Sequence, residues 1–397
     1  MTIRNSLYFF STAKQPVLEI KQPDSTNWRR PFVYAGAGRK VGEGEWLVDF
    51  EPPAAEAWQF RIDLGQGVYE APANQAYFST RLKRLWLQDG QIFDYRPAPA
   101  LSPPRVEKVA EFAGSLPARP LYIYLPRGYN EQPERFYPVL YMHDGQNCFE
   151  AFAGDSFAGS WRADETATEL IGQGRMQECL IVGVSNGQSE RIAEYMPPYL
   201  THRPPSPGVV RKAKTKGLVL RAQPLIGRAD QTAAYYRYEV AAYLAQNYRI
   251  RRGREHTATC GSSMGGLFSL YLAWERSEFA RHHAAMSPSL WMTRSPTGHL
   301  ETIERLRSDP ARDIRLWLDS GTQDTPEAGD DGMLDTQAAR QALLENGYQE
   351  GPNFRYYLAE GATHSEAAWA ARLPLIFQFL FPNGGEESES QEARSRK

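Results

Sequence analysis

The chain has 397 residues, of which 42% are hydrophobic, and a formal net charge of −2 at pH 7. This length favours two or three domains, and this hydrophobic fraction is typical of globular proteins with a large buried core. A nearly balanced charge gives no general attraction to nucleic acid or to an anionic membrane surface. No apolar run approaches the roughly 18 residues that a transmembrane helix needs. We therefore expect neither a nucleic-acid partner nor a membrane.

The N-terminus and the cysteines indicate the compartment. The N-terminal segment carries one basic residue and only a very short apolar stretch, which is too little for a signal peptide. The three cysteines, Cys148, Cys179 and Cys260, are odd in number and widely spaced. This pattern predicts neither a disulfide framework nor a zinc cluster. Both observations favour a cytoplasmic protein.

Residues 1–96 carry the pattern of an all-β domain. Four apolar residues alternate with polar ones, as in a half-buried strand: Trp58, Phe60, Ile62 and Leu64. Asp89-Gly90 stands between two apolar segments, which is typical of a two-residue hairpin turn. We therefore predict a small β-sandwich accessory domain over 1–96. The proline-rich residues 97–104 favour neither helix nor strand, and we expect a linker over 97–119.

Between residues 120 and 383, short apolar runs alternate with amphipathic segments. The predicted strands are Leu121–Leu125, Pro138–His143, Cys179–Val184, His256–Cys260, His283–Met286, Ile314–Leu318 and Phe354–Leu358. Helical spacing is present at 235–248 and at 266–276, among other segments. Such alternation predicts an α/β domain with a mainly parallel sheet and helices on both faces. The polar residues 384–397 are expected to form a disordered tail.

The segment Gly261-Ser262-Ser263-Met264-Gly265 matches the nucleophile elbow of hydrolases, with Ser263 at its centre. A sharp turn between a strand and a helix projects the hydroxyl into the open, and the two glycines avoid collisions with the neighbouring strand and helix. The residues 183–187 also match this pattern, but polar residues follow them. We therefore predict that Ser263 is the nucleophile and that Ser185 lies in a loop at the same edge of the sheet.

A serine hydroxyl needs a base to take its proton, and α/β-hydrolases carry nucleophile, acid and base in the order Ser, acid, His. Of the seven histidines, only His364 follows the acidic segment 319–324, so we predict His364 as the base. The alternative for it is an ordinary surface-loop histidine. Asp324, directly after a predicted strand, is our first choice as the acid. Three rivals stand in the same loop: Glu327, Asp330 and Asp331.

The negative charge that develops on the substrate oxygen needs two N–H donors. The backbone N–H of Met264, the residue after the nucleophile, is expected to be one of them. The other is expected from Gly145 or Gln146, in the loop after the strand that ends at His143, because glycine permits a close backbone approach. An ordinary Asp-Gly turn is the alternative for this loop.

Longer motifs surround these positions: Gly261–Leu267, Tyr141–Asn147, Ser287–Trp291, Arg191 with Glu194 and Tyr195, and His364 with Glu366, Trp369, Arg372 and Leu373. Together they resemble the enterochelin-esterase-like serine esterases, which are related to esterase D and to feruloyl and acetyl xylan esterases. The resemblance covers residues 120–381. It implies an α/β-hydrolase fold and a serine esterase with neither cofactor nor metal, and it supports Ser263 and His364. It also makes Arg191 a candidate for substrate binding.

Further features concern the substrate. Trp161 and Trp291 are candidates for lining an acyl or aromatic pocket, although aromatic residues more often belong to a core. Residues 197–230 depart from the family pattern with a basic insertion, predicted as a solvated loop or, alternatively, a lid that favours an anionic group. The N-terminal domain resembles the sandwich modules that precede such esterases. Four of its tryptophans are predicted as core or, alternatively, as a sugar-binding platform: Trp28, Trp46, Trp58 and Trp86.

These features predict the hydrolysis of a carboxylic ester through an acyl-serine intermediate. The substrate class expected is a small-molecule or sugar-linked ester, such as a siderophore, sugar or phenolic ester, and the fold does not choose among these. Two alternatives remain open. One is an acyltransferase on the same fold, and the other is a glycan-binding protein with an inactive hydrolase domain.

Overall fold

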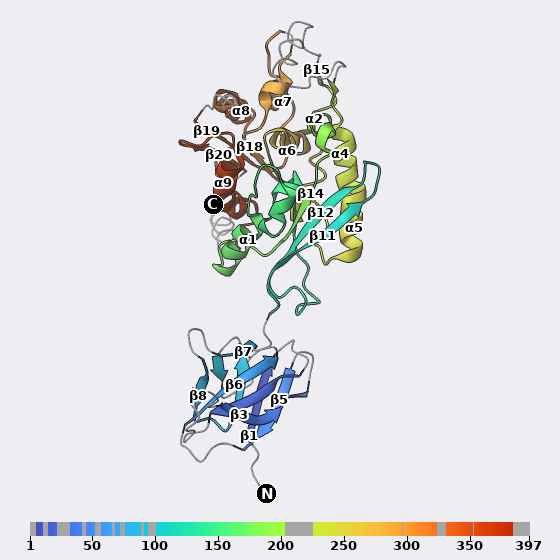
Figure 1. Cartoon of the computed structure of the whole chain (residues 1–397). Coiled ribbons are helices and arrows are strands. Elements are labelled where there is room, and N and C mark those ends of the chain that lie inside the picture. The colour runs from blue at the N-terminus through green and yellow to red at the C-terminus, as the bar shows by residue number, and fades with distance from the viewer. Residues whose placement is uncertain are drawn as a thin grey trace, which may run out of the picture. The chain divides into compact units, whose positions relative to one another are not determined.

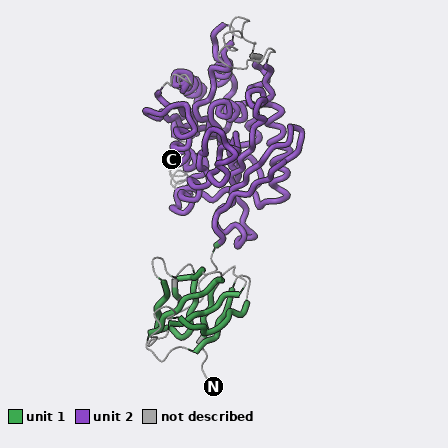
Figure 2. Tube along the Cα trace, in the orientation of Figure 1, with its two compact units in different colours: residues 1–101 green, residues 102–397 purple. Residues whose placement is uncertain are grey.

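The computed structural model divides the chain into two compact units, residues 1–101 and residues 102–397 (Figure 2). It describes residues 5–10, 15–21, 32–41, 45–51, 57–65, 68–71, 76–88, 91–93, 101–202, 225–295, 297–323, 331–351 and 353–383. Several predicted features lie outside the described residues: Trp28, the Asp89-Gly90 turn, most of the basic insertion (203–224) and the tail 384–397.

Unit 1 consists of two five-stranded sheets. The first has the order β10-β9-β1-β5-β4, with β1 (Asn5–Phe10), β4 (Arg39–Lys40), β5 (Glu45–Phe50), β9 (Arg84–Gln88) and β10 (Gln91–Phe93). The second has the order β3-β2-β6-β7 with β8 beside β6, and comprises β2 (Val17–Lys21), β3 (Phe32–Ala37), β6 (Trp58–Gly65), β7 (Val68–Glu70) and β8 (Phe78–Thr80). Apart from the parallel pair β1–β9, the neighbours are antiparallel.

The two sheets of unit 1 share one hydrophobic core. Phe9 and Val48 come to it from the first sheet, and Ile20 and Phe60 come from the second. Alternate residues of β6 are buried, as the alternation predicted, so the β-sandwich is confirmed. The described tryptophans Trp46, Trp58 and Trp86 are at most 9% exposed, which favours the core over a sugar-binding platform.

Unit 2 contains an eight-stranded sheet with the order β11-β12-β14-β13-β17-β18-β19-β20 (Figure 1). Its strands are β11 (Arg105–Phe112), β12 (Arg119–Leu125), β13 (Val139–His143), β14 (Leu180–Val184), β17 (Thr257–Ser262), β18 (His282–Met286), β19 (Arg315–Gly321) and β20 (Phe354–Ala359). The six strands from β14 to β20 are parallel, and β11 and β12 join antiparallel at one edge. All seven predicted strands are present, which confirms the mainly parallel sheet.

One strand replaces part of the predicted linker over 97–119. β11 begins at Arg105 and pairs with β12, so the sheet of unit 2 starts inside that segment. As an edge strand, β11 buries no side chain fully. Its sequence therefore lacks the continuous apolar run by which the other strands of this sheet were predicted.

The helices of unit 2 connect and cover the strands. They are α1 (Ala163–Gly172), α2 (Arg191–Tyr195), α4 (Ala229–Tyr235), α5 (Ala241–Asn247), α6 (Met264–Glu275), α7 (Glu301–Ser308), α8 (Met333–Glu345) and α9 (Glu366–Leu380). Short 3₁₀ helices lie at η1 (Gly145–Asn147), η2 (Glu150–Asp155), η3 (Gln188–Glu190), η5 (Arg254–His256) and η6 (Leu290–Thr293), and a π-helical turn, η4 (Tyr236–Val240), joins α4 to α5. A short pair, β15 (Thr201–His202) with β16 (Leu225–Ile226), flanks residues 203–224.

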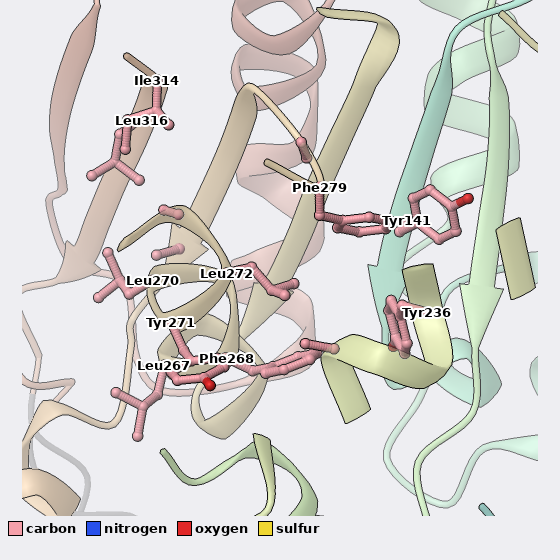
Figure 3. Close-up of a cluster of buried hydrophobic side chains, with 14 of the residues drawn as sticks. Tyr141, Tyr236, Leu267, Phe268, Leu270, Tyr271, Leu272, Phe279, Ile314 and Leu316 are labelled. Carbon is pink, nitrogen blue, oxygen red and sulfur yellow. The ribbon is translucent and has the colours of Figure 1, made fainter. Parts of the chain in front are cut away.

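Two hydrophobic clusters lie on the two faces of the sheet, because successive strand residues point to opposite sides. Tyr141 of β13 packs in one cluster with Phe268 of α6 and Tyr236 of η4 (Figure 3). Its chain neighbour Met142 belongs to the other cluster, with α1 and α9. Helices therefore cover both faces, as predicted. Among the described residues, no helix is long and apolar enough to span a membrane.

The parallel strands place the ends of several segments together. β13, β17, β18, β19 and β20 all run in one direction, so their carboxyl ends meet at one edge of the sheet. Ligands of open α/β sheets bind outside this edge. The loops that follow these strands carry nearly all the predicted site residues.

Candidate active site

Ser263 lies at a sharp turn between β17, which ends at Ser262, and α6, which begins at Met264. Its backbone has φ 56° and ψ −119°, a conformation that non-glycine residues rarely adopt and that costs strain. Neighbouring backbone holds the turn: the Ser263 N–H donates to the carbonyl of Met286 at 3.0 Å, and the Ser263 carbonyl accepts from Ser289 N–H at 2.9 Å. The predicted elbow is therefore present in the fold.

The elbow requires glycines because an added Cβ would be too close to neighbouring atoms. A Cβ at Gly261 would lie 2.5 Å from a ring carbon of His143 and 2.8 Å from the backbone of Gly265. A Cβ at Gly265 would lie 3.2 Å from His143, which is tight but less severe. Gly266, which the pattern did not single out, would place a Cβ 2.7 Å from the Met286 carbonyl oxygen. The turn thus packs directly against β13 and β18.

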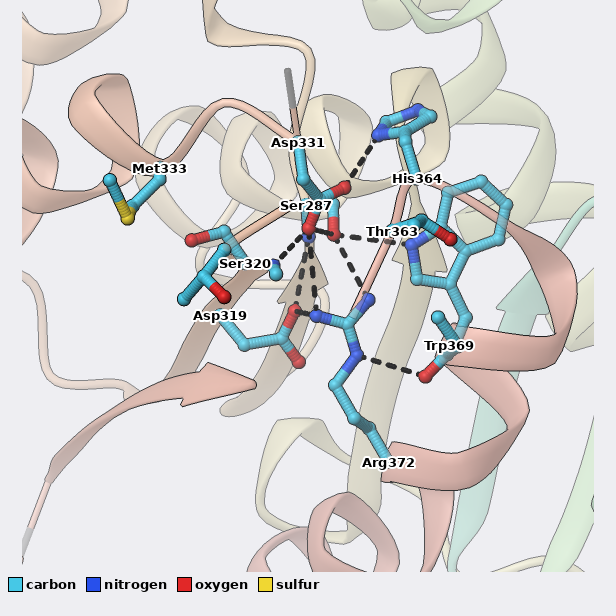
Figure 4. A network of polar contacts seen from close by, with 12 residues as sticks. Ser287, Asp319, Ser320, Asp331, Met333, Thr363, His364, Trp369 and Arg372 are labelled. Carbon is cyan, nitrogen blue, oxygen red and sulfur yellow. Dashed lines mark hydrogen bonds and ion pairs between the residues drawn. The ribbon is translucent and has the colours of Figure 1, made fainter. Parts of the chain in front are cut away.

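A chain of two hydrogen bonds begins at the Ser263 hydroxyl. Its Oγ lies 3.0 Å from Nε2 of His364, in the loop between β20 and α9. The other ring nitrogen, Nδ1, lies 2.7 Å from Oδ1 of Asp331, in the loop between β19 and α8 (Figure 4). Since a carboxylate only accepts, Nδ1 carries the proton and Nε2 is free to accept from the serine.

The carboxylate beside His364 differs from our first choice. Asp331, one of the three rivals, makes the hydrogen bond, whereas Asp324 lies outside the described residues together with Glu327 and Asp330. The first choice assumed that the acid directly follows the strand. The loop after β19 is longer, and the carboxylate that meets His364 stands just before α8 instead. Sequence spacing alone does not determine where such a loop returns to the sheet.

The Asp331 side chain is completely buried. Burial by itself raises the pKa of a carboxyl group, but hydrogen bonds from His364, from the Gly321 N–H and from the Ser287 hydroxyl hold the pKa of Asp331 below its ordinary value. Asp331 is therefore ionised at neutral pH and can stabilise a positive charge on His364.

Two residues beyond the predicted set touch the pair Ser263 and His364. The Ser289 hydroxyl lies 3.1 Å from Ser263 Oγ. The ring of Trp369 meets the His364 ring edge-on, with the centroids 4.9 Å apart. Residue spacing did not predict a place in the site for Ser289 or Trp369, although both stand in the motifs that carry the family resemblance.

The loop after β13 approaches the elbow. Asp144 adopts a left-handed conformation with φ 57°, and a Cβ at Gly145 would overlap the backbone of Gly183. A Cβ at Gly265 would lie 3.3 Å from Asp144 Oδ2, so this loop and the elbow are neighbours. In the described part of the chain, the backbone N–H groups of Gly145, Gln146 and Met264 bond to no acceptor. These three donors are available to a ligand.

Arg191 holds this loop in place. Its guanidinium pairs with the buried Asp144 through two bonds of 2.7 Å, one to each carboxylate oxygen. Asn186 donates to the same carboxylate at 2.5 Å. Burial raises the pKa of the Asp144 carboxyl, but the charge and hydrogen bonds of Arg191, together with the hydrogen bond from Asn186, hold that pKa below its ordinary value. Because its guanidinium is engaged by Asp144, a direct role of Arg191 in substrate binding stays a prediction.

The two predicted pocket tryptophans differ in exposure. Trp161 is 1% exposed and packs edge-on against Trp369 within a core cluster, with the ring centroids 6.2 Å apart. Trp291 is 55% exposed, in η6 just after Ser289. Ser185 lies directly after β14, at the predicted edge of the sheet, and no helix follows it at once.

A cavity of about 740 Å³ adjoins the loop after β13. Gln146, Asn186 and Arg191 line it on the side of the site, and Lys108, Tyr122 and Asp155 are among its other lining residues. In the parts of the chain that are described, no group of three or more His, Cys, Asp or Glu side chains is arranged to hold a metal ion.

A model of the Esterase family, described as "Putative esterase", matches residues 117–380. The chain belongs to this family. The Esterase domain coincides with the sheet of unit 2 and its helices, apart from β11. Membership makes the chain a carboxylic ester hydrolase of the serine-esterase type with an α/β-hydrolase fold, as the motifs predicted. No curated protein matches the sequence.

Solved esterases share the fold at low sequence identity. The enterobactin esterase FES of Shigella flexneri is 15% identical, with a TM-score of 0.51, over 93% of this chain and 89% of its own. An IroE-like serine hydrolase of Shewanella oneidensis is 19% identical, with a TM-score of 0.51, over 70% and 80%. A ferulic acid esterase is 17% identical, with a TM-score of 0.50, over 70% and 97%. The match to FES covers a larger share of the chain than residues 102–397 make up, so it extends into unit 1.

Proposed function

We propose that this Esterase-family protein hydrolyses its ester through an acyl-serine intermediate, with Ser263 as nucleophile, His364 as base and Asp331 as the acid of the triad. The observation that carries the proposal is the hydrogen-bonded chain from Ser263 Oγ through His364 to Asp331, with distances of 3.0 and 2.7 Å. The order of these residues along the chain, Ser, acid, His, agrees with the order in α/β-hydrolases.

The reaction follows from this arrangement. His364 Nε2 takes the proton from Ser263 Oγ as the oxygen attacks the carbonyl carbon of the ester, and Asp331 stabilises the imidazolium that forms. The imidazolium then gives its proton to the alcohol oxygen, the ester C–O bond breaks, and the acyl group stays on Ser263. Water attacks this acyl-serine with His364 again taking the proton, and the carboxylic acid leaves.

The oxyanion is proposed to bind the backbone N–H of Met264 and an N–H of Gly145 or Gln146. Three observations support this proposal. These donors have no acceptor among the described residues, the loop that carries Gly145 is adjacent to the elbow, and Met264 begins a twelve-residue helix, whose N-terminus favours negative charge. Donors fixed by the fold need no reorganisation as the charge develops, and removing one costs about 10²–10³ in kcat.

The substrate class proposed is a small-molecule or sugar-linked carboxylic ester, with siderophore, sugar and phenolic esters as the members to test. This range is supported by the family resemblance and by the folds of an enterobactin esterase and a ferulic acid esterase. A panel of p-nitrophenyl, feruloyl, acetyl-sugar and catecholate esters, varied in acyl chain and leaving group, would define the preference. Analysis of the products with an added alcohol would show whether water or the alcohol resolves the acyl-serine.

The nucleophile is tested with Ser263→Ala and a matched control, Ser185→Ala, which stands in the second segment of the same pattern. We expect Ser263→Ala to lose hydrolysis of p-nitrophenyl acetate and labelling by a fluorophosphonate probe, and Ser185→Ala to retain labelling. Normal hydrolysis by Ser263→Ala would refute the proposal. Persistent labelling of Ser263→Ala would assign the nucleophile to another residue.

The cytoplasm is the proposed compartment. The three cysteines are free, buried and without a disulfide, which is expected of a chain kept in a reducing environment. Cell fractionation of the source organism with an antibody to this protein would test the location, and recovery in a secreted or periplasmic fraction would contradict it.

A further inference from the structure

We propose that Ser287, fixed by Trp369 and Arg372 of α9, is a positioning residue that aims the Asp331 carboxylate at His364. This inference rests on the proposed hydrolysis, in which Asp331 is the acid. Ser287 directly follows β18, and its backbone has φ 39°, in the left-handed region that disfavours residues with a Cβ. The strained backbone places its hydroxyl among three polar groups (Figure 4).

The contacts of the Ser287 hydroxyl determine where its proton points. Trp369 Nε1–H donates to Ser287 Oγ at 3.2 Å, and Arg372 Nη2–H donates to it at 3.0 Å. A hydroxyl has two acceptor lone pairs and one proton, so both lone pairs are occupied. The proton is left to donate to Asp331 Oδ2, which lies 2.8 Å away. Neither a tryptophan N–H nor a guanidinium can accept, so this polarity cannot reverse.

The donors to Asp331 divide between its two oxygens. Oδ2 accepts from the Ser287 hydroxyl and from the Gly321 N–H, while Oδ1 is left for His364 Nδ1–H. Rotation of the carboxylate would break both bonds to Oδ2. The Ser287 hydroxyl and the end of β19 therefore hold the carboxylate plane, and with it the position of the imidazole ring that serves Ser263.

A second carboxylate, that of Asp319, holds Arg372 and the backbone of Ser287 in place. Asp319 is completely buried, and Arg372 forms an ion pair with its Oδ1 at 2.9 Å. The backbone N–H of Ser287 donates to the same oxygen at 3.1 Å, and Trp317 Nε1–H donates to Oδ2 at 2.8 Å. Arg372 thus connects α9 both to β19, through Asp319, and to Ser287. The residues that aim Asp331 come from three elements far apart in the sequence.

The charges of this cluster suit the reaction. Asp319 and Asp331 are two buried carboxylates, and Arg372 is the cation paired with them, at 2.9 and 3.9 Å. The net charge of Asp319, Asp331 and Arg372 is −1, and it stays −1 while His364 is neutral. When His364 is protonated in the transition state, the net charge of the four side chains becomes zero. The network therefore favours the imidazolium form at the moment when it is needed.

Loss of the Ser287 hydroxyl should act on the chemical step. In Ser287→Ala, Asp331 Oδ2 keeps only the Gly321 N–H as a donor and the N–H groups of Trp369 and Arg372 lose their acceptor, so the carboxylate turns away from His364 more easily. We expect kcat for p-nitrophenyl acetate to fall by about 10- to 100-fold with little change in KM, since a misplacement of about 1 Å costs on that order. Arg372→Met should have a similar effect, and Arg372→Lys should recover part of kcat because it keeps the charge.

The deciding experiment is a double-mutant cycle of Ser287→Ala with Asp331→Asn, measured on the full chain. If Ser287 acts through Asp331, adding Ser287→Ala to Asp331→Asn costs little further kcat. Ser320→Ala is the matched control, because its buried hydroxyl forms its hydrogen bond with Thr336, at 2.8 Å, rather than with Asp331 or Arg372; its kcat should stay near the wild-type value.

Two results would overturn the inference. One is an equal loss of kcat from Ser287→Ala in the wild-type and Asp331→Asn backgrounds, and the other is a wild-type kcat for Ser287→Ala. If Ser287→Ala does not fold, Arg372→Lys and Trp369→Phe each replace it in the double-mutant cycle with Asp331→Asn, and the same two results would overturn the inference. The proposed hydrolysis is judged separately by Ser263→Ala, so an active Ser287→Ala beside an inactive Ser263→Ala refutes only the positioning role.

Discussion

Nδ1 of His364 and Oδ1 of Asp331 lie 2.7 Å apart, although 33 residues separate them in the chain. The intervening chain forms α8 and β20, and β20 pairs in parallel with β19, so the loops after these two strands meet at the same edge of the sheet. The contact is made just before α8 rather than at the end of β19. This contact distinguishes Asp331 from the other acidic residues of its loop.

Asp331→Asn is expected to lower kcat by about 10⁴-fold, because an amide in place of the carboxylate favours the wrong tautomer of the histidine. KM should change little, since Asp331 is buried and does not contact the ester. Asp324→Asn is the control, and its kcat should remain near that of the wild type. A large loss for Asp324→Asn together with an active Asp331→Asn would reverse the assignment.

Gly261→Ala is expected to disable the elbow. The added Cβ would lie 2.5 Å from the His143 ring and 2.8 Å from the Gly265 backbone, so β13 or the turn must shift. Overpacking of this kind costs about 1–3 kcal/mol, and kcat should fall along with the melting temperature. Gly172→Ala, at the end of α1 with open space around it, is the control and should be neutral or slightly stabilising. A Gly261→Ala variant with normal Tm and kcat would show that the packing is looser than described.

Arg191→Met is expected to destabilise unit 2 and to lower kcat. It leaves the Asp144 carboxylate buried without its cation, and breaking a buried ion pair from one side costs about 3–5 kcal/mol. Because Asp144 precedes Gly145, the loop that carries the proposed oxyanion donors should shift as well. Denaturant unfolding and kcat measure the two effects. Arg191→Met combined with Asp144→Asn should recover stability, since no charge is then buried alone; failure to recover would contradict this account.

Acid is expected to destabilise the protein in part through His283. This buried histidine lies 2.8 Å from Thr259 Oγ1 and 3.0 Å from the carbonyl oxygen of Ala280, to which its Nε2–H donates, so the ring is neutral in the fold. Burial lowers its pKa from 6.5 to about 3. Between these values the unfolded chain binds a proton that the folded chain does not, so the free energy of unfolding should fall as the pH drops below about 6.5.

Urea unfolding at a series of pH values from 7.5 down to 4.5 measures this effect. His143 and His282, whose pKa values burial lowers to about 3 and about 4, contribute with the same sign. Asp319 opposes them, because burial raises its pKa to about 6. A His283→Gln variant should show a smaller loss of unfolding free energy over this range. An unchanged pH dependence in His283→Gln would indicate that the pKa of His283 is the same in the folded and unfolded chains, and would contradict this account.

Local patterns in the sequence predicted most elements of unit 2 and two residues of the candidate site. The run of apolar residues in each of the six inner strands reflects burial on both faces, so these strands were predictable, and the edge strand β20 was predicted as well. The elbow is set by a few consecutive residues, since the glycines and the serine fix one backbone turn, and Ser263 was therefore identifiable. His364 followed from chain order. The edge strand β11 was missed because an exposed edge carries little apolar pattern.

Tertiary structure decided which side chains meet. It places the Asp331 carboxylate within hydrogen-bond distance of His364, a contact that no spacing rule encodes. Ser287, Trp369 and Arg372 join the site only because β18 and α9 pack together, although 85 residues separate Ser287 from Arg372. Backbone conformation depends mainly on neighbours along the chain, so a few consecutive residues are enough to predict it. A hydrogen bond between distant segments depends on the packing of every element between them.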